Sequence, residues 1–245
     1  MRLFGRGDRK GTTASGAVNL TLEELVGEGR QLARPCVYLK DSGTGPVVGI
    51  WYEQEREPMR REVESAGELL WLVLDSRCVP HFPTLPDERR YLAVYSNERD
   101  GESGRVEERP ILEDQLCRRR AIPLYAHDAN PLPPLDAVFA RGSERVGVWL
   151  KEHNWQRDWR YNGNFGQPGR AITRQYEQLW TTETPSWAQK DVYAVLGGWH
   201  ETGPDGDWHD LIDEKLVLWT HREIEPSVEI WLNEEGGYTI YQRIS

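Results

Sequence analysis

Residues 215–245, KLVLWTHREIEPSVEIWLNEEGGYTIYQRIS, carry the clearest strand pattern of the chain. Its last two apolar runs are separated by residues 234–237 (EEGG), which are typical of a hairpin loop. Four short runs in the last third of the chain alternate apolar and polar side chains and are rich in β-branched and aromatic residues, as strands are: Asp191–Leu196, Leu216–His221, Ser227–Asn233 and Tyr238–Ile244. The pattern predicts a C-terminal antiparallel β-meander.

The alternation also assigns the side chains of this meander to two faces. One face receives Leu216, Leu218, Val228, Ile230, Leu232, Ile240 and Ile244. The other face receives Val217, Trp219, Trp231 and Tyr241. Because a face with several large apolar side chains is unfavourable in water, we expect a helix or a partner to cover it.

Upstream, Thr21 and Glu24 form a capping-box pattern that predicts a helix ending near Arg34. The β-rich runs Cys36–Lys40 and Val47–Glu53 flank the turn-forming sequence DSGTGP, so we expect them to form a hairpin. Two further strands are expected at Glu68–Asp75, which is apolar enough to be buried on both faces, and at Tyr91–Ser96. Helical spacing of apolar residues predicts helices at Pro110–Arg119 and Ala171–Thr182.

These elements predict an α+β fold: a single domain with a largely antiparallel sheet, the C-terminal β-meander and a few short helices. The domain is expected to span residues 19–245, and NPLPP at 130–134 is a candidate subdomain boundary. Residues 1–18 are Gly-rich, basic and poor in apolar groups, which is typical of a flexible N-terminal arm.

The expected location is the cytoplasm. The longest apolar run, Leu69–Leu74, is far shorter than the roughly 20 residues that cross a bilayer, so no membrane partner is expected. No apolar segment follows the basic start, as a secretory signal would require. The three cysteines, Cys36, Cys78 and Cys117, are odd in number and widely spaced, which favours reduced thiols over a disulfide framework.

The charge is unevenly distributed along the chain. Lys and Arg number 30 against 40 Asp and Glu, giving a net charge of -10. Residues 201–245 hold eleven acids and three bases, a charge of -8, whereas Arg141–Tyr176 holds seven bases and three acids, a charge of +4. The negative total argues against nucleic acid as a general partner, because phosphate binding depends on a basic surface. The acidic C-terminal segment could instead face a basic protein.

The densest polar cluster is GGWHETGPDGDWHDLIDE at 197–214. Its imidazoles and carboxylates are ligand types for Zn²⁺, Mn²⁺ or Fe²⁺, and the metal candidates are His200, Asp207 and His209, with Glu214 as a base. The spacing matches no metal motif, and Pro204–Gly206 with Asp207 also suits a turn followed by a helix cap. The cluster therefore supports either a divalent-metal site or a purely structural turn.

A second cluster, HNWQRDWRYNGNFGQPGR at 153–170, alternates basic side chains with large rings. Such mixing can stack on sugars or bases while pairing with anionic groups, and the candidate ligand-binding residues are Trp155, Arg157, Trp159 and Arg160. The alternative is that the tryptophans fill a core and the arginines pair with the acidic C-terminal segment.

Strong catalytic motifs are absent from the sequence: there is no nucleophile elbow, no phosphate-binding P-loop and no dinucleotide-binding glycine pattern. Cys78 and His81 could pair as nucleophile and base, but such dyads are usually assembled from distant segments. His127 is expected in a loop.

Two C-terminal segments, VYAVLGGWH at 192–200 and DGDWHDLIDEKLVLWTHREIEPSVEIWL at 205–232, resemble bacterial proteins that have no assigned activity. The similarity extends back through LPPLDAVF at 132–139 and WQRDWRYNGNF at 155–165. The resemblance implies a bacterial cytosolic protein and brings no catalytic residue, cofactor or substrate.

The sequence therefore favours a non-catalytic intracellular binding protein, without a cofactor, whose acidic C-terminal face masks a basic protein partner. Two alternatives stay open. One is a metal-dependent hydrolase centred on residues 200–214, and the other is recognition of carbohydrate or nucleotide through residues 153–170.

Overall fold

The computed structural model describes residues 19–53, 69–96, 104–113, 120–153, 168–183, 191–199, 215–220, 227–233 and 235–243. Within these ranges ten strands form one antiparallel sheet, ordered β10-β9-β8-β7-β1-β6-β2-β3-β4-β5. The strands are β1 (Cys36–Lys40), β2 (Val47–Tyr52), β3 (Leu69–Asp75), β4 (Tyr91–Ser96), β5 (Gly104–Arg109), β6 (Ala121–Ala129), β7 (Val192–Gly197), β8 (Lys215–Thr220), β9 (Ser227–Leu232) and β10 (Tyr238–Arg243).

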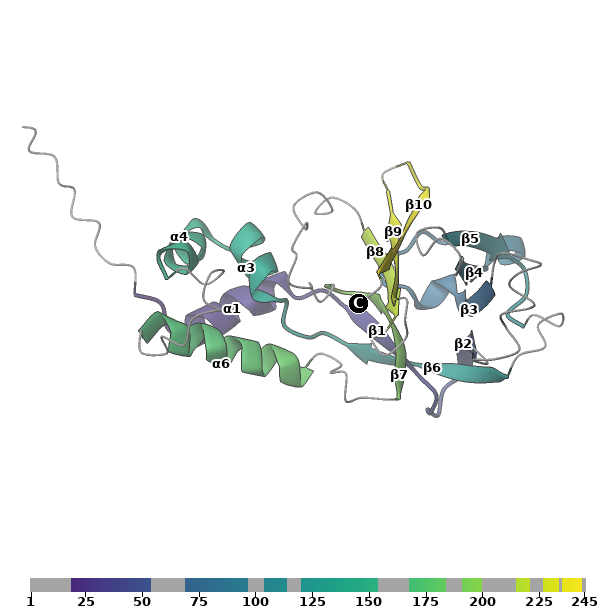
Figure 1. The fold of residues 1–245 in the computed structure, drawn as a ribbon, viewed down its shortest axis with the longest axis horizontal. Coiled ribbons are helices and arrows are strands. Elements are labelled where there is room, and N and C mark those ends of the chain that lie inside the picture. The colour runs from purple at the N-terminus through teal and green to yellow at the C-terminus, as the bar shows by residue number, and fades with distance from the viewer. Residues whose placement is uncertain are drawn as a thin grey trace, which may run out of the picture.

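The sheet consists of a central β1–β6 pair between two four-stranded meanders, β2 to β5 and β7 to β10 (Figure 1). The sheet curls so that its two edge strands, β5 and β10, approach each other and nearly close a barrel. A hydrogen bond joins this seam: the Tyr238 hydroxyl donates to Glu108 Oε1 over 3.1 Å. Phe82, between β3 and β4, stacks on the Tyr238 ring with centroids 6.3 Å apart.

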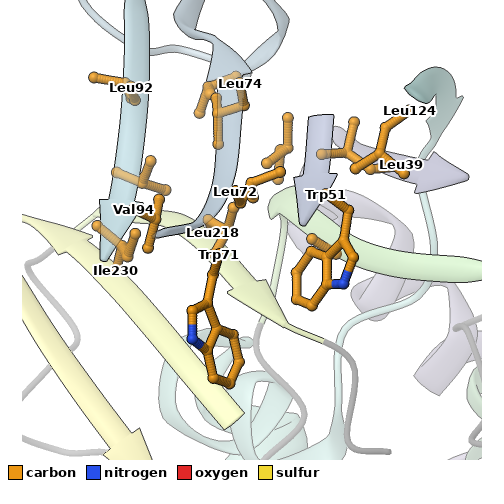
Figure 2. Close-up of a cluster of buried hydrophobic side chains, with 14 of the residues drawn as sticks. Leu39, Trp51, Trp71, Leu72, Leu74, Leu92, Val94, Leu124, Leu218 and Ile230 are labelled. Carbon is orange, nitrogen blue, oxygen red and sulfur yellow. The ribbon is translucent and has the colours of Figure 1, made fainter. Parts of the chain in front are cut away.

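Apolar side chains fill the interior of this near-barrel. The buried ones come from eight of the ten strands, and β5 and β10 add partly buried side chains. The largest buried ones include Trp71, Leu72, Leu74, Leu92, Leu124, Leu196 and Leu218, each no more than 1% exposed. Figure 2 shows Trp51 and Trp71 at one end of this cluster, with leucines of several strands above them. At about 25 cal/mol per Å² of apolar surface removed from water, such burial is the main source of stability.

Four α-helices in the described ranges lie beside the sheet (Figure 1): α1 (Leu22–Leu32), α3 (Leu135–Arg141), α4 (Glu144–Glu152) and α6 (Pro168–Glu183). They have a hydrophobic cluster of their own, which includes Leu25, Val138, Trp149 and Tyr176. The capping box predicted at Thr21 and Glu24 is present and begins α1. The fold is therefore α+β with an antiparallel sheet, although α6 has sixteen residues and is not a short helix.

The predicted C-terminal strands form, and they pair in chain order. Trp219 and Trp231 lie outside the barrel interior and are buried, at 5% and 6% exposure. Two assignments of side chains to faces are wrong, because Leu216 packs with this outer cluster while Val217 packs inside. The reason is a β-bulge between Leu216 and Leu218, where the pairing of β8 with β9 shifts and the alternation changes phase.

The hairpin predicted from Cys36–Lys40 and Val47–Glu53 is wrong, although both strands exist. β6 lies between them and pairs with each, so that Tyr125 is opposite both Lys40 and Val47. The connection at 41–46 crosses over β6, and Gly43 packs against the Tyr125 side chain. A strand from 80 residues further along the chain leaves no signal in the local turn pattern.

The other predictions have mixed outcomes. Leu70–Asp75 is buried at every position, as expected for β3. Pro110–Glu113 is not helical, and residues 114–119 lie outside the described ranges. The sequence patterns did not predict α3, α4, β5 or β6. Residues 130–134 form the coil between β6 and α3, and residues 1–18 lie outside the described ranges.

Cys36 and Cys78 are free thiols. Among the described helices, none is both long and apolar enough to cross a membrane.

Candidate functional site

The residues that the sequence singled out as sites lie outside the part of the chain that the structure describes. This holds for the ligand-binding candidates Trp155, Arg157, Trp159 and Arg160 and for the metal candidates His200, Asp207, His209 and Glu214. Within the described ranges no group of three or more His, Cys, Asp or Glu is arranged to hold a metal ion. Both alternatives therefore stay predictions.

The first residue of the Trp/Arg cluster is described, and its role is structural. His153 follows α4, where its Nδ1 lies 2.8 Å from the carbonyl oxygen of Trp149 and its ring stacks on the Trp149 ring at 4.3 Å. Of the basic stretch 141–176, Arg145 pairs with Glu24 of α1 over 2.8 Å, so this arginine serves the helix layer and not the acidic C-terminal segment.

Residues 76–90, which connect β3 to β4, cross one end of the near-barrel, which we call the capped end. Val79 packs into the barrel interior, Pro80 lies against Gly197 at the end of β7, and Phe82 stacks on Tyr238 at the start of β10. The loop thus links both meanders across this end.

Ion pairs hold the capping loop in place. Asp75, only 6% exposed, accepts from Arg90 Nε over 3.0 Å and from the Arg77 backbone N–H over 3.1 Å. The hydrogen bond to Asp75 is the main reason that the pKa of Arg90 is raised. Two further arginines of the loop pair with Asp87 and with Glu108, so the cations of this loop are neutralised locally: Arg77 and Arg89.

The Cys78–His81 pair, which the sequence analysis considered unfavourable as a dyad, does not have the properties of an activated nucleophile. Burial, followed by the charge of Asp75, raises the pKa of Cys78 to about 11, the opposite direction from that of a reactive thiol. His81 is exposed and has a φ of 58°, which is uncommon for a non-glycine residue. The pair is therefore part of the structure of the capping loop.

Two connections of the second meander leave and rejoin the described strands at the capped end. β7 pairs with β8, and β9 with β10, so that β7 and β9 finish where β8 and β10 begin, beside Gly197 and Tyr238. In the sequence, eight of the eleven acids of 201–245 fall between β7 and β8 or between β9 and β10: Glu201, Asp205, Asp207, Asp210, Asp213, Glu214, Glu234 and Glu235. Of these, Glu235 lies in the described ranges, where it is exposed.

The other three acids lie elsewhere. Glu223 and Glu225 fall between β8 and β9 in the sequence, outside the described ranges. Glu229 is in β9 and is only 1% exposed, where its Oε2 accepts from Trp231 Nε1 over 3.3 Å. Glu229, one of the eleven acids counted in residues 201–245, is therefore not part of an exposed acidic surface, because its side chain is buried against Trp231.

A cation–aromatic contact lies where the helices meet the capped end. The Arg34 guanidinium is 3.7 Å from the centroid of the Trp199 ring, and Trp199 Nε1 donates to the carbonyl oxygen of Leu32 over 2.9 Å. Gly197 and Gly198, with φ of 66° and 76°, turn the chain after β7 toward this contact. A Cβ on Gly198 would lie 2.8 Å from that of Cys36, so this turn requires glycine.

The opposite end of the barrel is aromatic. Trp51 packs against Trp71 edge to face at 5.8 Å and against Tyr193 at 5.7 Å, and the Tyr193 hydroxyl donates to Asp41 over 3.4 Å. His127, expected in a loop, is in β6, and its Nε2 lies 2.8 Å from the carbonyl oxygen of Ser42.

No protein-family model, curated protein sequence or solved structure matches this chain. Its function must therefore be argued from its own residues. Sequence reasoning missed the capping-loop ion pairs and the Arg34–Trp199 contact. The paired glycines before Trp199, at the end of a predicted strand, are the one local signal that could have indicated the turn behind this contact.

Proposed function

We propose that this chain is an intracellular, non-catalytic binding protein that binds a basic protein partner through the acidic residues at the capped end of the barrel. The observation that carries the proposal is that eight acidic residues fall, in the sequence, between strands whose adjoining ends lie at this end. Concentrated negative charge attracts a cationic surface and accelerates its encounter.

The capping loop supports this proposal by its internal pairing. Its arginines Arg77, Arg89 and Arg90 are each engaged with a carboxylate of the described residues. These three arginines therefore neutralise other carboxylates and do not neutralise the acidic residues of the two connections. A basic partner is the complementary surface.

The chemistry of the thiol and of the barrel interior also favours binding over catalysis. The Cys78 pKa of about 11 keeps the thiol protonated at neutral pH. The barrel interior is occupied by buried apolar side chains, in contrast to barrels that hold a small ligand inside.

The test compares two matched pairs of substitutions. Glu234→Gln with Glu235→Gln removes two charges between β9 and β10, and Glu223→Gln with Glu225→Gln removes two between β8 and β9. After affinity purification of the partner from native cells, calorimetry measures the affinity of each variant at several salt concentrations. We expect a loss of about three- to tenfold for the first pair, little change for the second, and an affinity that falls steeply with salt.

Equal effects of the two pairs, or an affinity that does not change with salt, would exclude the proposal. A third variant, with the six acids of 201–214 changed to their amides, should lose most of the affinity. Circular dichroism of each variant establishes that the sheet is intact.

A further inference from the structure

The described helices and strands bury their apolar side chains separately. The helices pack on one another, α1 on α3 and α6 and α3 on α4, and their hydrophobic cluster includes no residue of a strand. The clusters of the strands in turn include no residue of these helices. In Figure 1 the helices lie beside the sheet and far from β2 to β5. Within the described ranges, the two parts of the molecule therefore have separate apolar cores.

Two described connections join these parts, and they leave the sheet side by side. One is residues 33–35, between α1 and β1, and the other is residues 130–131, which follow β6. Cys36 pairs with Ala129, so the two connections start from neighbouring residues of the sheet. Residues 184–190, between α6 and β7, lie outside the described ranges. Two short connections that leave a sheet at the same place have the geometry of a hinge.

The second connection is short because the residues after it are already fixed to the helices. The Leu132 backbone N–H donates to Glu183 Oε2 over 3.0 Å, and the Pro133 carbonyl oxygen accepts from the Tyr176 hydroxyl over 2.9 Å. Leu132 is only 1% exposed and packs in the hydrophobic cluster of the helices. The change from sheet to helices is therefore confined to residues 130–131 on this side.

Hydrogen bonds tie the ends of α1 and α6 to the sheet. The Tyr38 hydroxyl of β1 donates to the carbonyl oxygen of Glu183, the last residue of α6, over 3.0 Å. Trp199, after β7, donates from its Nε1 to the carbonyl oxygen of Leu32, the last residue of α1, over 2.9 Å. The Arg34 guanidinium rests on the same indole, 3.7 Å from the ring centroid. These contacts are polar and local, unlike the packing inside either part.

Parts of a chain that are not joined by a large apolar interface are expected to move relative to each other. We propose that α1, α3, α4 and α6 form a helical unit that pivots on the barrel at residues 33–35 and 130–131. Tyr38 and Trp199 are the latches that hold this unit in the orientation described here. Release of the latches turns the unit as one body, because its apolar cluster and its Arg30–Glu183 ion pair stay intact.

The pivot does not rest on the proposed function, because it is tested on the chain alone, without a partner. Residual dipolar couplings of the backbone amides of the full chain, measured by NMR, report the orientation of each part. In a rigid molecule the amides of helices and strands fit one alignment tensor. A pivoting unit has a tensor of its own, and its magnitude is smaller than that of the barrel.

Tyr38→Phe and Trp199→Phe each remove the donor of one latch and keep an aromatic ring. Each substitution should raise the ratio of released to latched orientations by about two- to tenfold, because one hydrogen bond is lost. The alignment magnitude of the helix amides should therefore fall relative to that of the strand amides in each variant. The decrease should be largest in the double variant.

Tyr193→Phe is the matched control. The Tyr193 hydroxyl donates to Asp41 over 3.4 Å, so this variant also loses a tyrosine hydroxyl of the sheet but keeps both latches. Its ratio of helix to strand alignment should equal that of wild type. Amide chemical shifts of α1 and α6 show whether the helices are folded in each variant. If the double variant does not fold, the two single variants carry the test.

Three results would overturn the proposal. The first is one alignment tensor of equal magnitude for helices and strands in the folded latch variants, because the molecule is then rigid. The second is an equal change in Tyr193→Phe, because the effect is then not specific to the latches. The third is loss of the helices in the single variants, because Tyr38 and Trp199 are then needed for folding and do not hold a preformed unit.

Discussion

The two ends of the near-barrel are built from different interactions around one shared interior. At the capped end a loop is held by ion pairs, with Asp75 buried beneath Arg90. At the opposite end three aromatic rings pack together, and the ion pair of Lys40 with Asp191 lies at the surface. Since aromatic burial is stabilising and burial of charge is costly unless paired, the two ends should differ in what disrupts them.

The largest effect is expected at the aromatic end. Trp71 is 1% exposed, and Trp71→Ala would leave a large cavity beside Trp51, so the free energy of unfolding should fall by about 3–5 kcal/mol. Urea denaturation measures this loss. Trp71→Phe should cost much less, because Trp71 Nε1 is buried without a hydrogen-bond partner in the described residues and phenylalanine removes this donor. Equal losses for the two variants would contradict the cavity explanation.

At the capped end, the largest loss of stability should come from removing one partner of the buried Asp75–Arg90 ion pair. Arg90→Ala leaves the Asp75 carboxylate buried with only the Arg77 backbone N–H as a described donor, and should lower the free energy of unfolding by about 3 kcal/mol. The control is Arg77→Ala, which breaks the exposed pair with Asp87 and should cost less than about 1 kcal/mol. Comparable losses in these two variants would show that burial of Asp75 is unimportant.

The capped end should also be the more sensitive to alkaline pH. Burial raises the pKa of Cys36 and of Cys78 to about 11, from an ordinary value of 9.0. A group whose pKa is raised by folding contributes stability that is complete below the unfolded pKa and is lost as pH rises through the folded pKa. Stability should therefore fall between pH 9 and 11, by at most about 1.4 kcal/mol per pH unit for each thiol.

Unfolding of wild type and Cys78→Ala across this pH range measures the contribution of one thiol. The variant should have the shallower pH dependence. Parallel curves would mean that the Cys78 thiol titrates alike in the folded and unfolded chains.

The smallest effect is expected for the surface pair at the aromatic end. Lys40 donates to Asp191 over 2.8 Å, and Lys40→Met should cost only about 0.5 kcal/mol. The hydrogen bond from Lys40 is the main reason that the pKa of Asp191 is lowered from 3.8. The contribution of this ion pair to folding stability is therefore present above pH 3.8 and lost as the pH falls below it. Acid titration by NMR should show a higher Asp191 pKa in the variant than in wild type.

Local sequence patterns were sufficient to predict the strands of the C-terminal meander and their order, because each strand has its own alternation of side chains and pairs with its neighbour in sequence. They failed wherever a distant segment decides the structure. The turn sequence at 41–46 gives no indication that β6 inserts between β1 and β2. The bulge at Leu216–Leu218 depends on how β8 pairs with β9, and the Arg34–Trp199 contact depends on two backbone dihedral angles after β7.

The seam between β5 and β10 determines how the barrel opens. Every other neighbouring pair of strands is linked by a backbone ladder, whereas these two edges are joined by the Tyr238–Glu108 hydrogen bond. The Phe82–Tyr238 stack holds β10 to the capping loop beside the seam. Opening the seam breaks few interactions, so the outward-facing amides of β5 and β10 should exchange their hydrogens earliest among those of the sheet. The sheet would then unfold from its two edges toward its centre, and the amides of the β1–β6 pair would be the last to exchange their hydrogens.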